Sequence, residues 1–294
     1  MQIGVHLPHV GPQATRTTLI EFAHRMEALG YDSFWVSDHV VIPRHYESRY
    51  PYHPSGRLNW TDLPLLEPLS TLLFVAAVTE RAKLGTTVLV IPMRNPVLHA
   101  KIMATLDHLS SGRFILGAGT GWLREEFEAL ATPFDHRGAR MDEYLQVIKN
   151  LWTKDDPSFE GRYYRLGNVA CYPRPAQQPH PPIWIGGNTE PALRRAARLG
   201  DAWHGAGSTP EEVAAAAEKL RAYAREAGRA PEAVAVTVRT GLPAGEDPDA
   251  VLERMRRYQD AGVSHLCLET SFRDMARAYE TLERFAREVR PKLG

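Results

Sequence analysis

The chain alternates from its first residues to its last between short apolar runs with β propensity and longer amphipathic stretches with a helical period. Eight such units are found, with strands expected at Ile3–Leu7, Ser33–Val36, Lys83–Ile91, Arg113–Gly117, Ile183–Ile185, Ala202–His204, Val234–Arg239 and Ser264–Leu268. Eight strand-then-helix units in 294 residues favour a (β/α)8 barrel over an open doubly wound sheet. The alternation continues past the proline-rich segment 173–182, so the sequence predicts a single α/β domain, a TIM barrel over residues 1–294.

The helices are expected between these strands. Thr17 or Thr18 can cap the first helix, which Gly30 closes. The others are expected at Glu67–Arg81, Pro96–Leu109, Arg140–Trp152, Glu190–Leu199, Pro210–Ala227 and Pro248–Asp260, with a final helix that places Phe272, Met275, Tyr279, Leu282 and Phe285 on one face. Glycines punctuate alternating residues in Phe159–Val169, which predicts a small hairpin.

Composition excludes several classes of protein. Lys plus Arg equals Asp plus Glu at 35 each, so no nucleic-acid partner is indicated. The two cysteines, Cys171 and Cys267, exclude a disulfide scaffold and fit a reducing cytosol. The N-terminus has no basic region before a long apolar run, and no segment approaches the roughly 18 apolar residues of a membrane span. We therefore expect a cytoplasmic protein that acts on a small molecule away from membranes.

The stretch Arg113–Glu126 combines a strand, three glycines and the start of a helix. Its apolar run leads into Gly117, Gly119 and Gly121, whose bare backbone could approach an anionic ligand at a helix N-terminus. Trp122 stands where the last glycine of G-x-G-x-x-G would fall, so the dinucleotide motif is absent. Taken alone, this turn is more often a tight strand–helix connection than a phosphate site.

Residues Pro43–Pro64 interrupt the alternation. This stretch is rich in Tyr, His, Arg and Pro, contains Trp60, and has no sustained period. Loops of this length inside compact domains are usually functional or disordered, and the aromatic content argues against disorder. We interpret it as a lid.

The active site of such a barrel lies at the carboxyl ends of its strands. Those ends carry His6 and His9, Asp38 and His39, Thr86–Val90, Gly119–Trp122, Gly186–Asn188, Trp203 and His204, and Glu269. Each has an ordinary alternative, because a lone histidine is often structural, an aspartate can cap a loop and paired glycines can serve a turn. Together they indicate an anionic ligand held by backbone groups, with His39 near its reactive end.

Several stretches resemble the luciferase-like flavin and deazaflavin oxidoreductases. They are MQIGVHLP, GYDSFWVSDHV, KLGTTVLVIPMRNP, GRFILGAGTGWLREEFEALATPFDHRGARMDEYL and PPIWIGGN, which together span Met1 to about Ala206. The combination of GTGWLREEFEAL with GVHLP is similar to the branch that uses coenzyme F420, a deazaflavin. A more distant branch uses FMN with molecular oxygen.

The resemblance implies positions for the cofactor. Its ring would cross the strand ends against a bulge with a non-prolyl cis peptide at Thr87-Val88, and Asp38 and His39 match the polar pair beside it. The phosphate tail would meet Gly186, Gly187 and Asn188, flanked by Thr120 and Gly121. His6, Trp122 and His204 are assigned to the substrate pocket, and the family implies a homodimer. Some deazaflavin enzymes have a carboxylate where Trp122 stands, and the nearest acids here are Glu125 and Glu126.

These observations leave several functional hypotheses. The first is an oxidoreductase that moves a hydride between F420 and a small organic substrate, with His39 handling the proton and Asp38 orienting or charging its imidazole. An FMN monooxygenase is its alternative within the family. A metal-dependent hydrolase could use His6, His9, Asp38, His39 and His204, although glycines interrupt that set and we expect no metal site. A barrel that binds a ligand without chemistry is the last.

Overall fold

The computed structural model describes residues 1–293, and their strands close into a parallel barrel. The barrel strands are β1 (Gln2–His6), β2 (Ser33–Val36), β3 (Lys83–Thr86), β4 (Leu89–Val90), β5 (Phe114–Gly119), β8 (Ile183–Gly186), β9 (Ala202–Ala206), β10 (Ala235–Gly241) and β11 (Val263–Glu269). β1 pairs with both β2 and β11, and β3 pairs with both β2 and β5, which closes the sheet. β3 and β4 are two parts of one barrel strand, so the predicted eight-stranded TIM barrel is confirmed.

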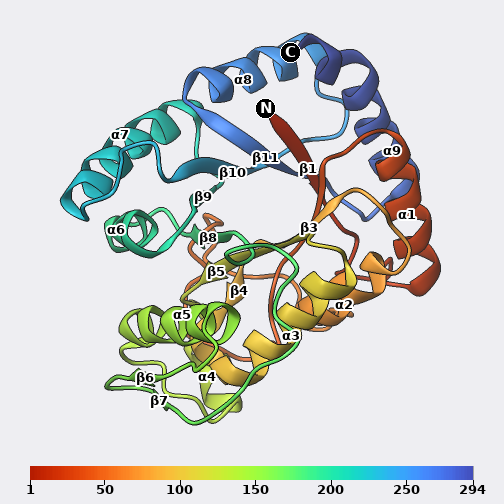
Figure 1. Ribbon diagram of the computed structural model, residues 1–294. Helices are drawn as coiled ribbons and strands as arrows, with labels where there is room; N and C mark the ends of the chain where they lie inside the picture. The colour runs from red at the N-terminus through yellow and green to blue at the C-terminus, as the bar shows by residue number, and fades with distance from the viewer. Residues whose placement is uncertain (294) are drawn as a thin grey trace.

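Helices form an outer ring around this barrel (Figure 1). They are α1 (Arg16–Ala28), α2 (Pro68–Ala76), α3 (Pro96–Leu109), α4 (Arg124–Ala129), α5 (Arg137–Thr153), α6 (Glu190–Leu199), α7 (Pro210–Glu226), α8 (Pro248–Asp260) and α9 (Met275–Arg284). The predicted hairpin is confirmed as β6 (Phe159–Glu160) and β7 (Arg165–Leu166), which lies outside the barrel beside α5. Within residues 1–293, no helix has both the length and the apolar character needed to cross a membrane.

Several predicted helix boundaries are wrong, among them the start of α5, which begins at Arg137 instead of Arg140. The cap of α1 is Thr15, whose Oγ1 accepts a hydrogen bond from the Thr18 amide at 3.2 Å, because α1 starts earlier than its apolar stripe. α2 ends at Ala76 instead of Arg81. Phe272 precedes α9, yet its ring packs edge-on against Phe22 at a centroid distance of 5.4 Å, so it joins the core without belonging to the helix.

The third barrel strand is broken in the middle. The Thr87-Val88 peptide is cis, as the resemblance implied, and it separates β3 from β4, so the continuous strand expected over Lys83–Ile91 is not found. A 3-10 turn (η1, Ile91–Met93) follows directly.

Glycines on both sides accommodate this break. A Cβ on Gly117 would overlap the Thr86 carbonyl oxygen, and one on Gly119 would overlap the Val88 side chain. A Cβ on Gly186 would lie 2.5 Å from Val88 Cγ1. Three of the glycines noted in the sequence therefore let β5 and β8 approach the broken strand, which holds Val88 between them.

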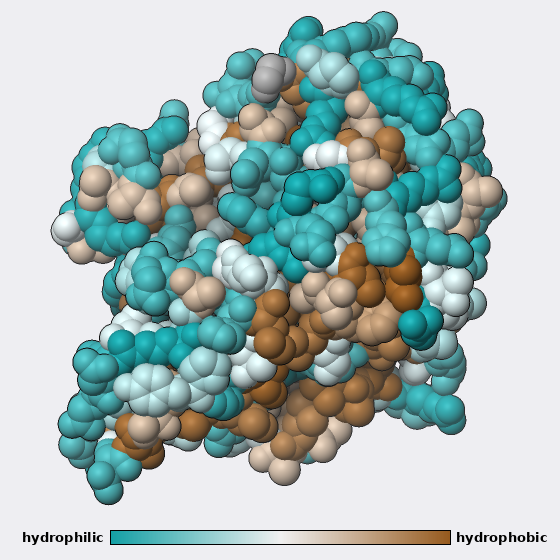
Figure 2. Space-filling view, turned by 45° about the vertical axis from the view of Figure 1, so that its right-hand side comes forward, coloured by the Kyte–Doolittle hydropathy of each residue, from teal (hydrophilic) through white to brown (hydrophobic). Residues whose placement is uncertain are grey.

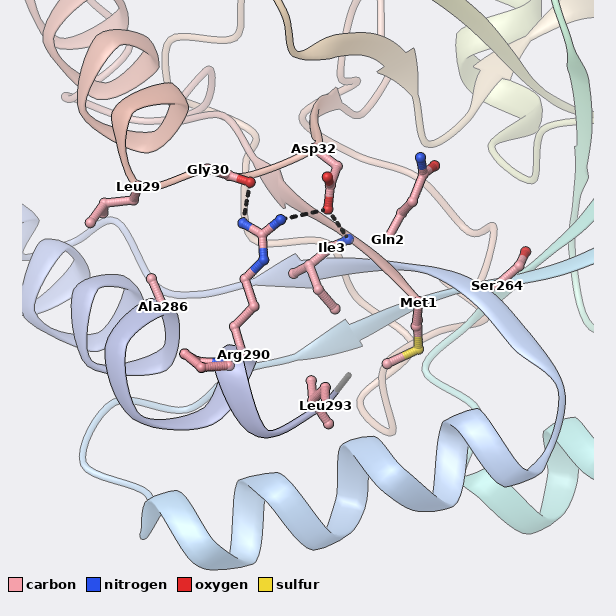
Figure 3. A pocket seen from close by; sticks show the side chains of 11 residues that line it. Met1, Gln2, Ile3, Leu29, Gly30, Asp32, Ser264, Ala286, Arg290 and Leu293 are labelled. Atoms are coloured by element: carbon pink, nitrogen blue, oxygen red, sulfur yellow. Dashed lines mark hydrogen bonds and ion pairs between the residues drawn. The ribbon is translucent and has the colours of Figure 1, made fainter.

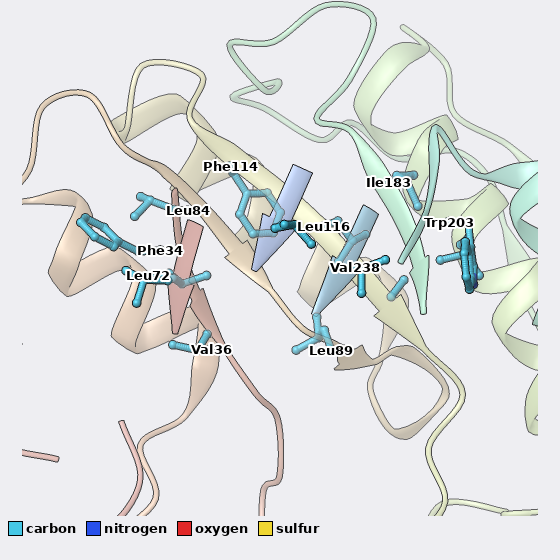
Figure 4. Close-up of a cluster of buried hydrophobic side chains, with 14 of the residues drawn as sticks. Phe34, Val36, Leu72, Leu84, Leu89, Phe114, Leu116, Ile183, Trp203 and Val238 are labelled. Atoms are coloured by element: carbon cyan, nitrogen blue, oxygen red, sulfur yellow. The ribbon is translucent and has the colours of Figure 1, made fainter. Parts of the chain in front are cut away.

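The core has two layers. The larger layer lies between strands and helices, where side chains such as Phe34, Leu72, Leu84 and Phe114 are fully buried (Figure 4). The barrel interior is filled by a smaller, aromatic cluster around Trp35.

Trp35 stacks on Trp184 at a centroid distance of 4.8 Å and on His204 at 5.5 Å. Gly4 and Gly85 on the neighbouring strands have no side chain, and a Cβ on either would overlap the Trp35 ring. This interior packing closes the barrel beneath the pocket described next.

Candidate active site

A cavity of about 790 Å³ opens at the carboxyl ends of the strands, which is where the active site was expected. All but one of the residues assigned to catalysis, the cofactor or the substrate pocket line it: Asp38, His39, Thr87, Val88, Thr120, Gly121, Trp122, Gly186, Gly187, Asn188 and His204. Of the other strand-end candidates, His9, Thr86, Leu89, Trp203 and Glu269 do not line it. The Pro43–Pro64 loop, which contains turns but no helix or strand, contributes Arg49, Tyr50, Pro51, Tyr52, Leu58 and Trp60 to the same lining. The loop therefore covers the cavity, as its interpretation as a lid requires.

His6 is the exception. Its ring is buried, its Nε2 lies 3.1 Å from Ser37 Oγ, and Ser37 lines the cavity in its place. The pKa of His6 is lowered well below its usual value by burial first and by the nearby His9 second. The assignment of His6 to the substrate pocket is therefore wrong, because β1 turns this side chain into the barrel interior.

His39 is held at the cavity by a carboxylate from α4. Its Nδ1 lies 2.7 Å from Glu126 Oε2, and the side chains of His39 and Glu126 are only 8% and 2% exposed. The rings of Trp60 and Trp122 stand edge-on to the imidazole at centroid distances of 6.1 and 6.0 Å. A buried histidine that lies between two indoles and bonds to a carboxylate is an arrangement suited to proton transfer.

This contact also fixes the tautomer of His39. An ionised carboxylate can only accept, so Nδ1 must carry the proton that it donates to Glu126. The Nε2 atom is then the nitrogen available to a ligand, and it has no hydrogen-bond partner among residues 1–293.

Asp38 does not have the role that the sequence suggested. Both of its oxygens bind the Arg94 guanidinium, at 2.5 and 2.7 Å, and Oδ2 also accepts the Val90 amide at 2.8 Å. This bidentate ion pair ties the end of β2 to β4 and η1. The partner of His39 is thus Glu126, and Asp38 positions the backbone around the broken strand.

His204, which lines the cavity above the barrel interior, is held in a neutral form. Its Nδ1 lies 2.8 Å from Thr237 Oγ1, and because that hydroxyl donates to the Trp203 carbonyl, Nδ1 must be the donor. Nε2 then accepts from Thr87 Oγ1 at 2.9 Å, beside the cis peptide. Burial, reinforced by Arg239, lowers the pKa of His204 to about 3, so this side chain stays uncharged at neutral pH.

Arg239 adds a positive charge to the same lining. Its Nε lies 3.4 Å from Glu269 Oε2, and its Nη1 lies 3.5 Å from both Ser37 Oγ and the Thr87 carbonyl oxygen. Burial opposes the charge, but Glu269 outweighs it and holds the pKa of the guanidinium above its usual value. Arg239 is therefore a permanent cation that faces the cavity.

Backbone groups and further cations also line the cavity. Two helices present their N-termini there, α5 through Arg137 and Gly138 and α6 through the segment Gly186–Thr189. Arg137 donates from Nε to the Gly121 carbonyl at 3.0 Å, and Arg195, which pairs with Asp142, lies beside Gly138. Helix N-termini together with guanidinium groups favour an anion.

The Asn188 side chain is engaged elsewhere. It donates to the Ala206 carbonyl at 2.7 Å and accepts from the Ala206 amide at 3.0 Å, which joins the ends of β8 and β9. Any contact of residues 186–188 with a cofactor would therefore come from their backbone.

The cavity has room for a cofactor that carries an anionic group. Its volume is typical of ligand sites, and its lining combines His39 with helix N-termini and guanidinium groups. The family of the chain follows from its match to a family model. The model of the luciferase-like monooxygenases matches residues 1–291. The chain belongs to this family.

Members of the family with different cofactors are similar to the chain. The F420-dependent glucose-6-phosphate dehydrogenase of Amycolatopsis mediterranei is 29% identical over 332 residues and covers 94% of each chain. The FMNH(2)-dependent dimethylsulfone monooxygenase of Pseudomonas putida is 35% identical over 157 residues, which are 52% of this chain and 43% of that enzyme. The crystal structure of the monooxygenase RslO1 from Streptomyces bottropensis covers 100% of both chains with a TM-score of 0.80 and 21% identity, and it supports the luciferase-like barrel fold.

The five side chains that a metal-dependent hydrolase would use have other partners. His6 and His9 bond to Ser37, Asp38 binds Arg94, His39 binds Glu126, and His204 lies between two threonines. Within residues 1–293, no group of three or more His, Cys, Asp and Glu side chains is arranged to hold a metal ion.

The sequence did not reveal the contact between Glu126 and His39, nor the guanidinium groups of the lining. Glu126 was noted only as a nearby acid: it follows Trp122 by four residues, about one helical turn, but α4 is too short to establish a period before the fold is known. Arg239 closes the expected seventh strand, Val234–Arg239, so the strand-end rule applied there would have found it.

Proposed function

We propose that the chain is an oxidoreductase that transfers a hydride between coenzyme F420 and a small organic substrate, with His39 as the proton donor or acceptor. The observation that carries this proposal is the buried His39–Glu126 pair, which leaves Nε2 for the cavity. The F420-dependent relative, which matches almost the whole chain, supports the choice of cofactor.

The residues of the chain would share the work as follows. The deazaflavin supplies a ring carbon that gains or loses hydride. Thr87 and Val88 would lie along the ring. The backbone at 186–188, flanked by Thr120 and Gly121, would bind the anionic tail together with Arg137 and Arg195. His39 would deliver or remove one proton at Nε2, next to the reacting substrate atom. Trp60 and Trp122 would exclude water from that point.

The alternative is a monooxygenase that uses reduced FMN and molecular oxygen. The similarity to the FMNH(2)-dependent dimethylsulfone monooxygenase supports it, although over a shorter match. FMN carries one phosphate, and the same helix N-termini would accept it.

Comparative titration of the cofactor-free protein tests the proposal. We expect F420 to bind more tightly than FMN or reduced FMN, by at least about tenfold, which is about 1.4 kcal/mol. Tighter binding of reduced FMN together with substrate-dependent oxygen uptake would assign the chain to the monooxygenase branch instead.

We also propose that the protein is a cytoplasmic homodimer, with α2 and α3 at the interface. Leu98 and Leu109 of α3 are 56% and 67% exposed, and Leu73, Phe74 and Ile102 are partly exposed on the same two helices. Figure 2 shows hydrophobic side chains gathered over the part of the surface where Figure 1 places these helices. Analytical ultracentrifugation of the wild type and of Leu98→Glu tests this: we expect a dimer that the substitution weakens, and a monomeric wild type would contradict it.

A further inference from the structure

We infer that Glu126 is a positioning residue that holds both His39 and the backbone of Val40 and Val41, so that one carboxylate joins the proton-transfer group to the segment that leads into the Pro43–Pro64 loop. This inference rests on the proposed function in taking His39 as the proton-transfer residue. Its evidence is a division of labour between the two oxygens of Glu126, which come from α4 and are almost completely buried.

Oε2 of Glu126 serves His39 alone, at 2.7 Å from Nδ1. Oε1 accepts two amides of the chain that leads into the loop, from Val40 at 2.7 Å and from Val41 at 3.3 Å. The lid end and the imidazole are therefore bound to opposite oxygens of one carboxylate.

The two sets of bonds use both oxygens as acceptors. A carboxylate can accept at each oxygen, so Oε1 takes the Val40 and Val41 amides while Oε2 takes the Nδ1–H of His39. Movement of Val40 and Val41 away from α4 would leave Oε1 without these donors in a buried site, which is costly.

The neighbouring Glu125 provides a matched control. Its Oε1 accepts the Glu47 and Ser48 amides, at 2.7 and 3.1 Å, so it also anchors the loop from α4, but it does not bond to His39. Both amides go to one oxygen, so Glu125→Gln can keep both bonds through the amide oxygen.

Glu126→Gln cannot do the same. An amide group has one acceptor oxygen and one donor nitrogen. If the glutamine oxygen accepts the Val40 and Val41 amides, its NH₂ group faces Nδ1 of His39 and can bond to it only when the ring changes to the Nε2–H tautomer. If the oxygen instead accepts from Nδ1–H, the NH₂ group faces the two amides, which are also donors. The substitution keeps the size of the side chain and removes its ability to accept from both partners at once.

Other charges around the pocket are unchanged by these substitutions. Asp38 remains paired with Arg94, and the remaining charged groups of the lining are Arg49, Arg137, Arg195 and Arg239. A change in the tautomer of His39 is therefore attributable to Glu126.

The experiment uses the full-length, cofactor-free protein, so it does not depend on which cofactor binds. NMR of ¹⁵N- and ¹³C-labelled histidine gives the tautomer of His39, and trypsin cleavage after Arg44, Arg49 and Arg57 reports opening of the loop. We expect Glu126→Gln either to change His39 to the Nε2–H tautomer or to make loop cleavage at least about fivefold faster, since a lost buried hydrogen bond costs about 1 kcal/mol. Glu126→Ala has no acceptor and should do both. Glu125→Gln should leave the tautomer of His39 as in the wild type.

Several results would overturn the inference. They are an Nε2–H tautomer of His39 in the wild type, a Glu126→Gln variant in which neither measurement changes, and a change of tautomer in Glu125→Gln. If the Glu126 variants do not fold, Val41→Pro removes one of the two amides on Oε1 without touching the carboxylate, and it should speed cleavage while His39 keeps its Nδ1–H tautomer. Unchanged cleavage in that variant would contradict the link between Glu126 and the loop. Failure of F420 to bind would remove the proposed function and leave these outcomes as they are.

Discussion

Each end of the barrel has a cavity with charged side chains. At the amino end these charges are paired with one another, whereas at the carboxyl end some polar groups have no protein partner in the part of the chain that the structure describes. At the amino ends of the strands, a cavity of about 600 Å³ contains Asp32 and Arg290 (Figure 3). Asp32 Oδ2 accepts from the Ile3 amide at 2.7 Å and from Arg290 at 3.1 Å, and Arg290 also donates to the Gly30 carbonyl. These charges satisfy one another and tie the C-terminal segment to the start of the barrel.

The carboxyl end leaves polar groups uncommitted. His39 presents Nε2 to a cavity of similar size, and no carboxylate within residues 1–293 forms an ion pair with Arg137. Neither the size of a hollow nor the presence of an acid and an arginine therefore distinguishes a functional site. Polar groups that the protein positions and does not itself satisfy are the better sign.

The largest effect should be a loss of folding stability at acid pH, caused by one buried histidine near each end of the barrel. His204 lies under the carboxyl-end cavity, and His265 bonds to Gln2 near the amino end. Burial lowers the pKa of both to about 3, aided by Arg239 for His204 and by Lys83 for His265. Above about pH 6.5, the ordinary value for histidine, neither the folded nor the unfolded form is protonated at these rings.

As the pH falls from about 6.5 towards 3, His204 and His265 bind protons in the unfolded chain but stay neutral in the folded protein. The free energy of unfolding should then fall by up to about 1.4 kcal/mol per pH unit for each histidine. Urea unfolding at a series of pH values measures this slope, and His204→Gln and His265→Gln should each reduce it. Equal slopes in wild type and both variants would mean that other groups control acid stability.

The next largest effect should be a loss of turnover when His39, at the carboxyl-end cavity, is replaced. His39→Ala removes the group that would move a proton, and general acid–base catalysis contributes about 10²–10⁴-fold. We expect the turnover number to fall by at least about 100-fold while cofactor affinity stays within about tenfold. His39→Gln keeps a hydrogen bond but cannot transfer a proton, so near wild-type turnover in that variant would make His39 a positioning residue only.

Strand order in the sequence predicted the barrel and the placement of His39 at the cavity. The resemblance to the luciferase-like family implied the cis peptide at Thr87-Val88, which the structure contains. The partners of the polar groups were not predicted. Asp38 is next to His39 in the chain but binds Arg94, and the carboxylate that reaches His39 comes from 87 residues away. Such pairings depend on how separate loops meet, which neither periodicity nor motif spacing encodes.

Asp32→Ala should affect the amino end alone. Loss of its carboxylate leaves the Ile3 amide and the Arg290 guanidinium without their acceptor, which costs about 1–3 kcal/mol when the groups are buried, and less in proportion to their partial exposure here. We expect a lower midpoint of thermal unfolding and an unchanged Michaelis constant and turnover number below that midpoint. A loss of turnover in the folded variant would show that the two ends are coupled, which their separate hydrogen-bond networks do not suggest.

Arg137→Ala should give the smallest effect and should act at the carboxyl end alone. Arg137 is partly exposed, stacks on Phe134 at 3.9 Å and has its Nε on the Gly121 carbonyl, so its charge is anchored but not neutralised by an ion pair. If it meets the anionic tail, its removal should weaken cofactor binding by about tenfold at low salt, and the difference should shrink as ionic strength rises and screens the charge. Arg137→Lys keeps the charge and should recover part of the affinity. A dissociation constant that does not change in Arg137→Ala at any salt concentration would mean that the backbone of α5 and α6 binds the tail without this guanidinium.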